Sequence, residues 1–316
     1  MLIMENVPWI EKYRPSDFNN IVLDATNKKI LLNIVKKRYF PNLLFYGPPG
    51  TGKTTTIINL IDLYHKEYNL KKKGCMIHLN ASDDRGIDII RNQINQFVNT
   101  KTLFGEGMKF VILDEVDYMT KNAQQALRYL IQQYSDNIRF CLICNYISRI
   151  EYALQNEFVR LRFCQLPKTK VFKFLNTIQK NENLNISNQT IFAIQNMFKS
   201  DIRSMINFLQ SNHTEEKNII KSNIITNKVW EKLIEKIKKD KPHIIVNLVL
   251  KQCSKYNIEV KEFINKFIQY LVLKESETLN DKFIKTFKYI VHNSSVDDEY
   301  FLNYFIYSIV ELYKLL

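Results

Sequence analysis

Short apolar runs alternate with segments of helical periodicity between residues 27 and 164. This alternation is typical of a parallel sheet, because its crossover helices cover both faces of the strands. The apolar runs predict strands over Asn42–Tyr46, Cys75–Leu79, Lys109–Leu113, Ile138–Cys144 and Val159–Phe163. The periodic segments between them predict helices over Lys53–Tyr68, Ile87–Val98 and Asn122–Tyr134. Residues 1–164 are therefore expected to form an α/β domain with a parallel five-stranded sheet and helices on both faces.

The pattern changes after Pro167, where helical spacing continues without strand-like alternation. Periodicity predicts helices over Lys168–Asn181, Asn188–Phe198 and Asp201–Ser211, which would form a small helical domain over residues 165–212. The polar stretch at 212–227 is interpreted as a linker. Residues 228–316 carry helical spacing of Leu, Ile, Phe and Tyr, and all seven glycines lie within the first 107 positions. The sequence thus predicts a third, all-α domain over 228–316.

The formal net charge of +13 and a pI near 9.3 indicate an acidic partner, either a phosphate polymer or an acidic protein. Lysine enrichment of the kind found in proteins from AT-rich genomes explains the charge equally well. No apolar run approaches the roughly 20 residues of a membrane span, and the first eleven residues lack a secretory pattern. We therefore expect an intracellular protein without membrane contact.

The five cysteines include one C-x-x-C pair, Cys141 and Cys144. A zinc site would need a second pair of ligands, and a redox pair would need to begin a helix. Because Ile, Phe and Leu flank these thiols, we interpret them as strand residues of a protein in a reducing compartment.

A glycine-rich segment joins the first predicted strand to the helix that follows it. Glycines there let the backbone curve around phosphates, and the new helix offers unpaired N–H groups. Its residues are Gly47, Pro48, Pro49, Gly50, Thr51, Gly52, Lys53 and Thr54. Lys53 is expected to reach the β- and γ-phosphates, and the Thr54 hydroxyl to bind Mg²⁺. The segment therefore predicts a site for a nucleoside triphosphate with Mg²⁺, and we favour ATP.

Two carboxylates, Asp114 and Glu115, end the predicted strand over Lys109–Leu113. Ligands of parallel sheets lie at the carboxyl ends of strands. We expect Asp114 to hold Mg²⁺ through a water molecule and Glu115 to act as the general base that polarises the attacking water. The pair predicts hydrolysis as well as binding.

Two further polar positions could reach the same phosphates. Asn145 follows the next predicted strand, where its amide could hydrogen-bond the γ-phosphate or the water. Arg203 lies in the first turn of a predicted helix for which Asp201 is a plausible cap. An arginine there opposes the helix dipole, so a nearby anion would explain it.

Together these motifs resemble those of the AAA+ ATPases, and specifically the small subunits of replication factor C. The resemblance is strong over residues 5–210 and weak beyond. Its stretches are Val7–Pro15, Gly47–Thr56, Leu79–Asp88, Ile112–Glu115, Ala123–Arg128 and Leu142–Tyr146.

The resemblance implies further roles and partners. It makes Asn145 and Arg203 the sensors of the γ-phosphate, the small helical domain a lid, and the C-terminal domain an oligomerisation collar. It adds Ile10, Arg14, Val22 and Thr55 to the nucleotide contacts. It also implies a hetero-pentamer of clamp-loader subunits, a sliding clamp and primer-template DNA as partners, with Arg85 and Arg91 as candidate DNA contacts or ordinary solvent-facing charges. The same family points to the nucleus, although a viral replication compartment or an archaeal cytoplasm fits similar motifs.

Two departures qualify this picture. The family carries an arginine near the last strand that reaches the neighbouring subunit's ATP site, and Glu157 stands in its place. We therefore expect this chain not to activate its neighbour. Lys199 and Ser200 replace the glycine that usually precedes the lid motif. Two alternatives to an ATPase subunit of a clamp loader stay open: a subunit that binds ATP mainly for assembly, and another AAA+ machine such as a helicase loader or branch-migration motor.

Overall fold

A computed structural model describes residues 7–68, 74–82, 87–99, 108–134, 138–212, 225, 227–275, 279–292 and 297–314. The chain divides into two compact units, each described here by itself. One unit comprises Met1–Leu184 and Gln195–His213, and the other comprises Asn185–Ile194 and Thr214–Leu316.

A parallel sheet forms the centre of the first unit. Within the described residues its five strands follow the order β2-β3-β4-β1-β5. The strands are β1 (Leu43–Tyr46), β2 (Met76–Asn80), β3 (Lys109–Asp114), β4 (Ile138–Cys144) and β5 (Val159–Arg162). This confirms the predicted sheet, with ends shifted by one residue in four strands. The register aligns Asn80 with Asp114 and Tyr46 with Cys144, so the carboxyl ends of neighbouring strands share one edge.

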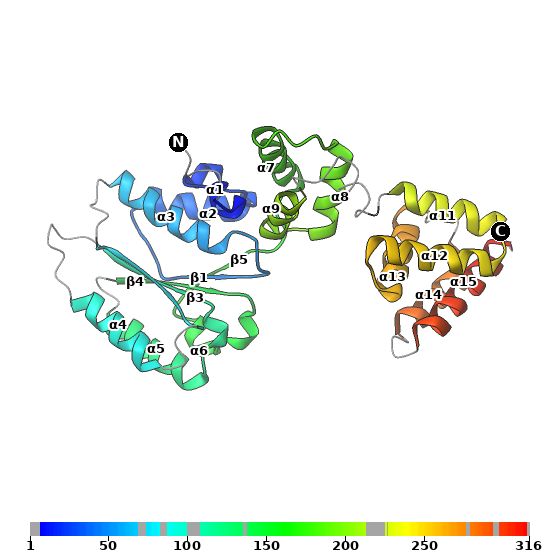
Figure 1. Cartoon of the computed structure of the whole chain (residues 1–316). Coiled ribbons are helices and arrows are strands. Elements are labelled where there is room, and N and C mark those ends of the chain that lie inside the picture. Colours follow the sequence, from blue (N-terminus) through cyan, green and yellow to red (C-terminus); the bar gives the residue numbers. More distant parts are fainter. Residues whose placement is uncertain are drawn as a thin grey trace. The chain divides into compact units, whose positions relative to one another are not determined.

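Helices cover both faces of this sheet (Figure 1). On one face lie α2 (Ala25–Lys36) and α3 (Lys53–Glu67), and on the other α4 (Ile87–Asn99), α5 (Lys121–Gln133) and α6 (Tyr152–Gln155). Alternate residues of one strand enter the two cores: Leu43 and Phe45 join the core with α2 and α3, and Leu44 joins the opposite core. Each fully buried side chain of this size contributes about 1.5–3 kcal/mol.

The C-x-x-C pair lies inside β4, as predicted. Burial raises the pKa of both the Cys141 and the Cys144 thiols, that of Cys144 to about 12. Thiols held in the neutral form are poor nucleophiles and poor metal ligands.

The N-terminal segment of the first unit is attached to the helices that follow the sheet. The N-terminal segment contains α1 (Trp9–Lys12) and the short turn η1 (Phe18–Asn20), and the helices after the sheet are α7 (Lys168–Asn181), α8 (Asn188–Phe198), which the two units share, and α9 (Ile202–Ser211). Two further short turns, η2 (Val116–Tyr118) and η3 (Ile147–Arg149), follow β3 and β4. The backbone N–H of Trp9 donates to Gln210 Oε1 at 2.9 Å, and Lys12 Nζ lies 2.7 Å from Glu182 Oε1. The Tyr13 hydroxyl donates to the same carboxylate. The buried Trp9 is thus packed in the fold.

The second unit is helical, as predicted. Its helices, besides part of α8, are α11 (Asn227–Lys239), α12 (Pro242–Tyr256), α13 (Val260–Lys274), α14 (Asp281–His292) and α15 (Asp298–Lys314). Trp230 anchors its core, with its ring 4.8 Å from that of Phe263 and 5.6 Å from that of Phe267. The predicted linker lies mostly outside the described residues. Among the helices that the structure describes, none has the length and apolar character that crossing a bilayer requires.

Candidate functional site

The predicted phosphate-binding loop lies between β1 and α3, as expected from its sequence context. Gly47, Gly50 and Gly52 adopt positive φ angles of +142°, +70° and +85°. A Cβ on Gly47 would lie 1.8 Å from the carbonyl oxygen of Phe163, so only glycine fits there. The Thr51 hydroxyl donates to the Pro48 carbonyl at 2.9 Å and stabilises the bend. The loop is therefore preformed by its own hydrogen bonds.

Lys53 begins α3 and turns its side chain back over the loop. Its Nζ donates to Gly47 O at 2.7 Å, to Pro48 O at 2.9 Å and to Asn145 Oδ1 at 3.0 Å. Burial lowers the pKa of Lys53, the Asp114 carboxylate opposes this shift, and the Arg203 charge adds to it. The structure thus brings together the predicted lysine, the amide after β4 and the arginine of α9.

Asp114 ends β3 opposite the first turn of α3. Its Oδ2 accepts a hydrogen bond from the Thr54 hydroxyl at 2.7 Å, and its Oδ1 accepts from the Glu115 backbone N–H at 2.9 Å. Burial would raise the pKa of Asp114, but the neighbouring His78 and these hydrogen bonds lower it overall. An ionised carboxylate beside a hydroxyl is a donor set that Mg²⁺ accepts. The residues present therefore fit the implied metal.

Glu115 is held in an uncommon backbone conformation. Its φ is +57°, in the left-handed region that non-glycine residues seldom adopt. Such strain costs about 1–3 kcal/mol and persists where the surrounding structure enforces it, often at functional sites.

Asp117 is a residue of the site that the sequence analysis did not single out. It is buried in η2, and its Oδ2 accepts from the backbone N–H groups of Asn145 at 3.3 Å and Tyr146 at 3.2 Å. This carboxylate fixes the segment that carries Asn145. In the sequence, its position two residues after Glu115 is the signal that could have identified Asp117 as part of the site.

The start of α9 contacts the tip of the phosphate loop. Asp201 caps α9 by accepting from the Ser204 backbone N–H at 3.0 Å, which confirms the predicted cap. The Ile202 N–H donates to Gly50 O at 3.1 Å. Arg203 is exposed in this first turn. The helix that carries Arg203 is therefore itself attached to the phosphate loop.

The two residues that replace the lid glycine have defined positions. Lys199 takes φ +56°, a conformation that glycine adopts at lower cost. Ser200 Oγ accepts from the Leu166 backbone N–H at 3.1 Å and links the segment after β5 to α9. The entry to α9 is thus retained, with backbone strain at Lys199.

The structure does not bring the remaining predicted nucleotide and DNA contacts together at the phosphate loop in the same way. A pocket of about 460 Å³ places Arg14 near Thr55 of α3. Ile10 is half-buried in α1, and Val22 is buried. Their roles toward a nucleotide stay predictions. For the DNA candidates, Arg85 lies outside the described residues, and of Arg91 only the backbone in α4 is described.

Glu157 turns toward α5. Its Oε1 accepts from Arg128 Nε at 3.2 Å and from Gln132 Nε2 at 2.8 Å. The nearby Arg160 and Arg162 are exposed on β5. Glu157 therefore masks part of the charge of Arg128 on this surface.

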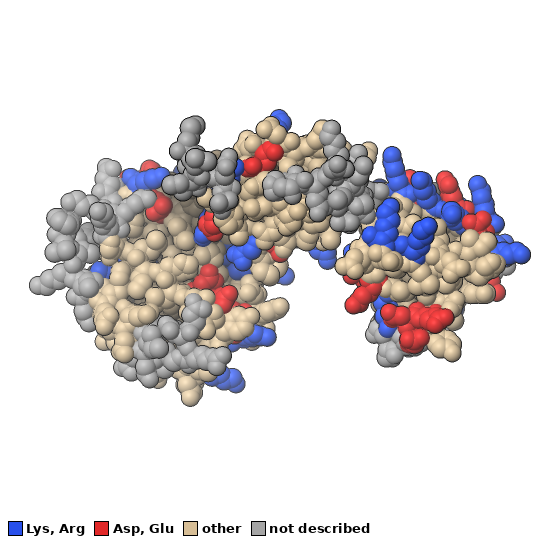
Figure 2. All heavy atoms as spheres, in the orientation of Figure 1, with Lys and Arg blue, Asp and Glu red and all other residues tan. Residues whose placement is uncertain are grey.

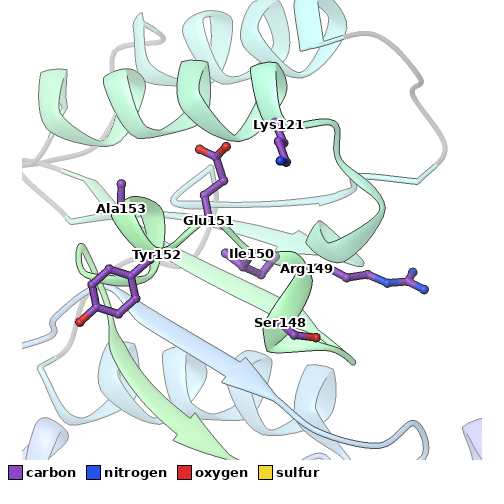
Figure 3. Close-up of a pocket in the computed structure, with 7 residues that line it drawn as sticks. All are labelled: Lys121, Ser148, Arg149, Ile150, Glu151, Tyr152 and Ala153. Carbon is purple, nitrogen blue, oxygen red and sulfur yellow. The ribbon is translucent and has the colours of Figure 1, made fainter.

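A second pocket, of about 430 Å³, lies beside the start of α5 (Figure 3). Lys121 projects from α5, and Arg149 and Tyr152 belong to η3 and α6. Buried Gln124 holds this wall together, because its amide donates to Arg149 O at 3.0 Å and accepts from Glu151 N–H at 2.8 Å. The pocket is lined by the cationic Lys121 and Arg149, the aromatic Tyr152 and the acidic Glu151, on the side of the domain that carries η3.

A glycine-rich loop between strand and helix, a lysine, a hydroxyl and a strand-end carboxylate define a P-loop nucleotide-binding domain. Residues 43–166 match the model of the ATPase family associated with various cellular activities. The chain belongs to the replication factor C small-subunit family: it is 42% identical over 221 residues to replication factor C small subunit 2 of Pyrobaculum arsenaticum, covering 70% of this chain and 68% of that relative.

Eukaryotic relatives match over a similar region. Replication factor C subunit 3 of Schizosaccharomyces pombe is 41% identical over 207 residues, and replication factor C subunit 5 of Homo sapiens is 43% identical over 209 residues. Each alignment covers 66% of this chain, and it spans 60% and 61% of the two relatives' own lengths.

One solved structure supports the fold alone. The RuvB Holliday junction branch migration motor of Thermotoga maritima superposes with a TM-score of 0.50 at 13% identity, covering 83% of this chain and 91% of that chain.

Proposed function

We propose that the chain is an ATP-hydrolysing subunit of a DNA sliding-clamp loader. The observation that carries the proposal is the convergence of Lys53, Thr54, Asp114 and Asn145 on one preformed loop, joined to α9 through Gly50. Membership of the replication factor C family supports the clamp-loader context.

ATP would replace the present hydrogen-bond partners of the loop. Lys53 would exchange carbonyl oxygens for phosphate oxygens, and Thr54 and Asp114 would hold Mg²⁺. When bound, Mg²⁺ neutralises charge that develops on the β- and γ-phosphate oxygens. Glu115 would orient the attacking water and accept its proton, while Asn145 would bind the γ-phosphate. Arg203 would contact the same phosphate and so link the nucleotide to the lid helices.

Paired variants test this assignment. Lys53→Ala should abolish ATP binding, measured by equilibrium titration with a fluorescent ATP analogue. Glu115→Gln should bind the analogue normally and lower the hydrolysis rate by about 10²–10⁴-fold. Glu311→Gln, an exposed position in α15, is the control and should change neither quantity. Hydrolysis by Glu115→Gln at the unmodified rate would show that another group is the base.

The partners are part of the same proposal: sibling subunits in a hetero-pentamer, a sliding clamp and primer-template DNA. The net charge of +13 supports a polyanionic partner. Figure 2 nevertheless shows basic side chains gathered over α11 of the second unit, so the charge alone does not identify a DNA-binding surface. Purification with native partners tests the assignment, since a clamp loader must bring a clamp and siblings. Recovery of a different hexameric machine would overturn it.

Two features bear on the alternatives. Intact Lys53, Asp114 and Glu115 favour turnover over a purely structural role, and Glu157 supports the inference that this chain does not activate its neighbour.

The relatives also bear on where in the cell the chain works. The eukaryotic relatives support the nucleus, and the archaeal relatives keep the cytoplasm of an archaeon as an alternative.

A further inference from the structure

Asp117 joins the two segments that carry the proposed base and the proposed γ-phosphate ligand. It lies in η2, the turn that begins directly after Glu115, where the Tyr118 N–H donates to Glu115 O at 3.0 Å. Its Oδ2 accepts from the N–H groups of Asn145 at 3.3 Å and Tyr146 at 3.2 Å. One side chain thus ties the segment after β3 to the segment after β4.

The two N–H groups that Asp117 binds lie beyond the end of β4. This strand ends at Cys144, and its pairing with β1 ends there as well, at Tyr46. Backbone N–H groups that leave a sheet beside the core need another acceptor, and the Asp117 carboxylate supplies it. The path of the chain at Asn145 is therefore set by a side chain.

This path determines where the carboxamide of Asn145 points. Its Oδ1 accepts from Lys53 Nζ at 3.0 Å, so the side-chain NH₂ is the group left to donate to a phosphate oxygen. Hydrogen bonds weaken steeply as their length and angle depart from the optimum. A small displacement of the backbone at Asn145 would thus weaken the contact with the γ-phosphate and leave the phosphate loop itself intact.

Stability alone explains the burial of Asp117 poorly. The residue is 5% exposed, and within the described part of the chain its Oδ1 has no hydrogen-bond donor. A carboxylate buried with one oxygen unpaired disfavours folding, and an apolar residue of similar volume would pack at lower cost. Burial lowers the pKa of Lys53, and the carboxylates of Asp114 and Asp117 are among the groups that oppose this shift. The buried carboxylate therefore lies within electrostatic range of the lysine of the site.

We propose that Asp117 is a positioning residue, which holds the Asn145 amide where it distinguishes a nucleoside triphosphate from a diphosphate. This inference rests on the proposed function, in which Asn145 binds the γ-phosphate. Asp117 acts through the backbone of Asn145 and does not contact the nucleotide. It also gives the turn after Glu115 and the end of β4 a common anchor, so that the base and the γ-phosphate ligand keep a fixed separation.

Nucleotide discrimination measures this role in the full chain. The ratio of the dissociation constants for ADP and ATPγS is determined by equilibrium titration with Mg²⁺. Asn145→Ala should lower this ratio about tenfold, the loss expected for one hydrogen bond to a charged oxygen. Asp117→Ala should lower it by a similar factor, because the amide is then misplaced. Asp24→Ala is the matched control: Asp24 accepts from the Asn27 N–H at 2.8 Å at the start of α2, and its loss should leave the ratio unchanged.

A double variant shows whether Asp117 acts through Asn145. In the Asn145→Ala background, Asp117→Ala should change the ratio less than twofold, since the amide that it positions is already absent. Asp117→Asn keeps an acceptor oxygen for the two N–H groups and should hold the ratio within about threefold of the unmodified value. If circular dichroism shows that Asp117→Ala does not fold, Asp117→Leu, which fills the space without an acceptor, takes its place.

Three results for the variants would overturn the proposal: an unchanged ratio in Asp117→Ala, a loss in Asp117→Asn as large as that in Asp117→Ala, or additive losses in the double variant. Equal affinities of the unmodified chain for ADP and ATPγS would also overturn it, since there would be no γ-phosphate contact to position. The nucleotide site itself is tested separately, by the loss of ATPγS binding in Lys53→Ala. No binding of ATPγS to the unmodified chain would refute both the site and the role of Asp117.

Discussion

Gly50→Ala tests the contact between the phosphate loop and α9. A Cβ at Gly50 would lie 1.7 Å from Asp201 Oδ1 and 2.5 Å from its Cγ, and the residue has φ +70°. Gly52 has a similar φ of +85°, but a Cβ there meets no atom within 4 Å. Gly52→Ala is therefore a control that carries the backbone strain without the collision.

The expected magnitude follows from three contributions. Alanine in the left-handed region costs about 1 kcal/mol at either position. At Gly50 the methyl group also displaces the Asp201 cap and the Ile202 N–H bond to Gly50 O, which together stabilise α9 by about 2 kcal/mol. Gly50→Ala should thus destabilise the start of α9 by about 3 kcal/mol and Gly52→Ala by about 1 kcal/mol.

Native-state hydrogen exchange of the first turn of α9 measures this difference locally, which avoids assuming that the two units unfold together. The opening constant of this turn should be about 30-fold larger in Gly50→Ala than in Gly52→Ala. Asp201→Gly in the Gly50→Ala background removes the colliding atoms and leaves a tolerated cap, so it should recover most of the difference. Equal effects of the two alanines, without recovery, would refute a direct contact between loop and α9.

Three further predictions concern other parts of the first unit. Lys199→Gly should relieve the strain of φ +56° and raise the free energy of unfolding by about 1 kcal/mol in urea titrations; a loss of stability would show that the lysine side chain matters more. The pKa of Tyr13 is raised to about 12 by burial and by the Glu182 carboxylate, whereas an unfolded tyrosine titrates near 10. The associated stability is therefore complete below about pH 10 and lost as the pH rises toward 12, and Tyr13→Phe should reduce this decline in unfolding midpoints. Glu157→Arg removes the acceptor of Arg128 and should raise the ATPase rate of an assembled complex; an unchanged rate with the neighbouring site occupied would count against the assignment.

Local patterns predicted most of the architecture. Apolar runs gave the five strands, and the context of Gly47 to Thr54 between strand and helix was correct because both depend on residues close in sequence. Two strands were extended by a polar residue that joined the ladder, since Asn80 pairs with Asp114, whereas Asn42, Cys75 and Phe163 lie just outside the strands predicted to include them. Periodicity cannot detect such additions, because a polar residue at a strand end looks like the start of a loop.

Contacts between distant residues were not predictable in the same way. Asp117 and Asn145 are 28 positions apart, and Tyr13 and Glu182 are 169 apart. The approach of His78 to Asp114 depends on the register of an edge strand. No spacing rule connects these positions, so the residues that orient the site emerged only with the fold.

The placement of the two tryptophans has a practical consequence. Trp9 is buried in α1 and attached to α9 through Gln210, whereas Trp230 lies in the core of the second unit. Each compact unit therefore carries its own intrinsic fluorophore. In a Trp230→Phe variant, emission would come from Trp9 alone, and nucleotide-dependent movement of α9 could be followed without an added label.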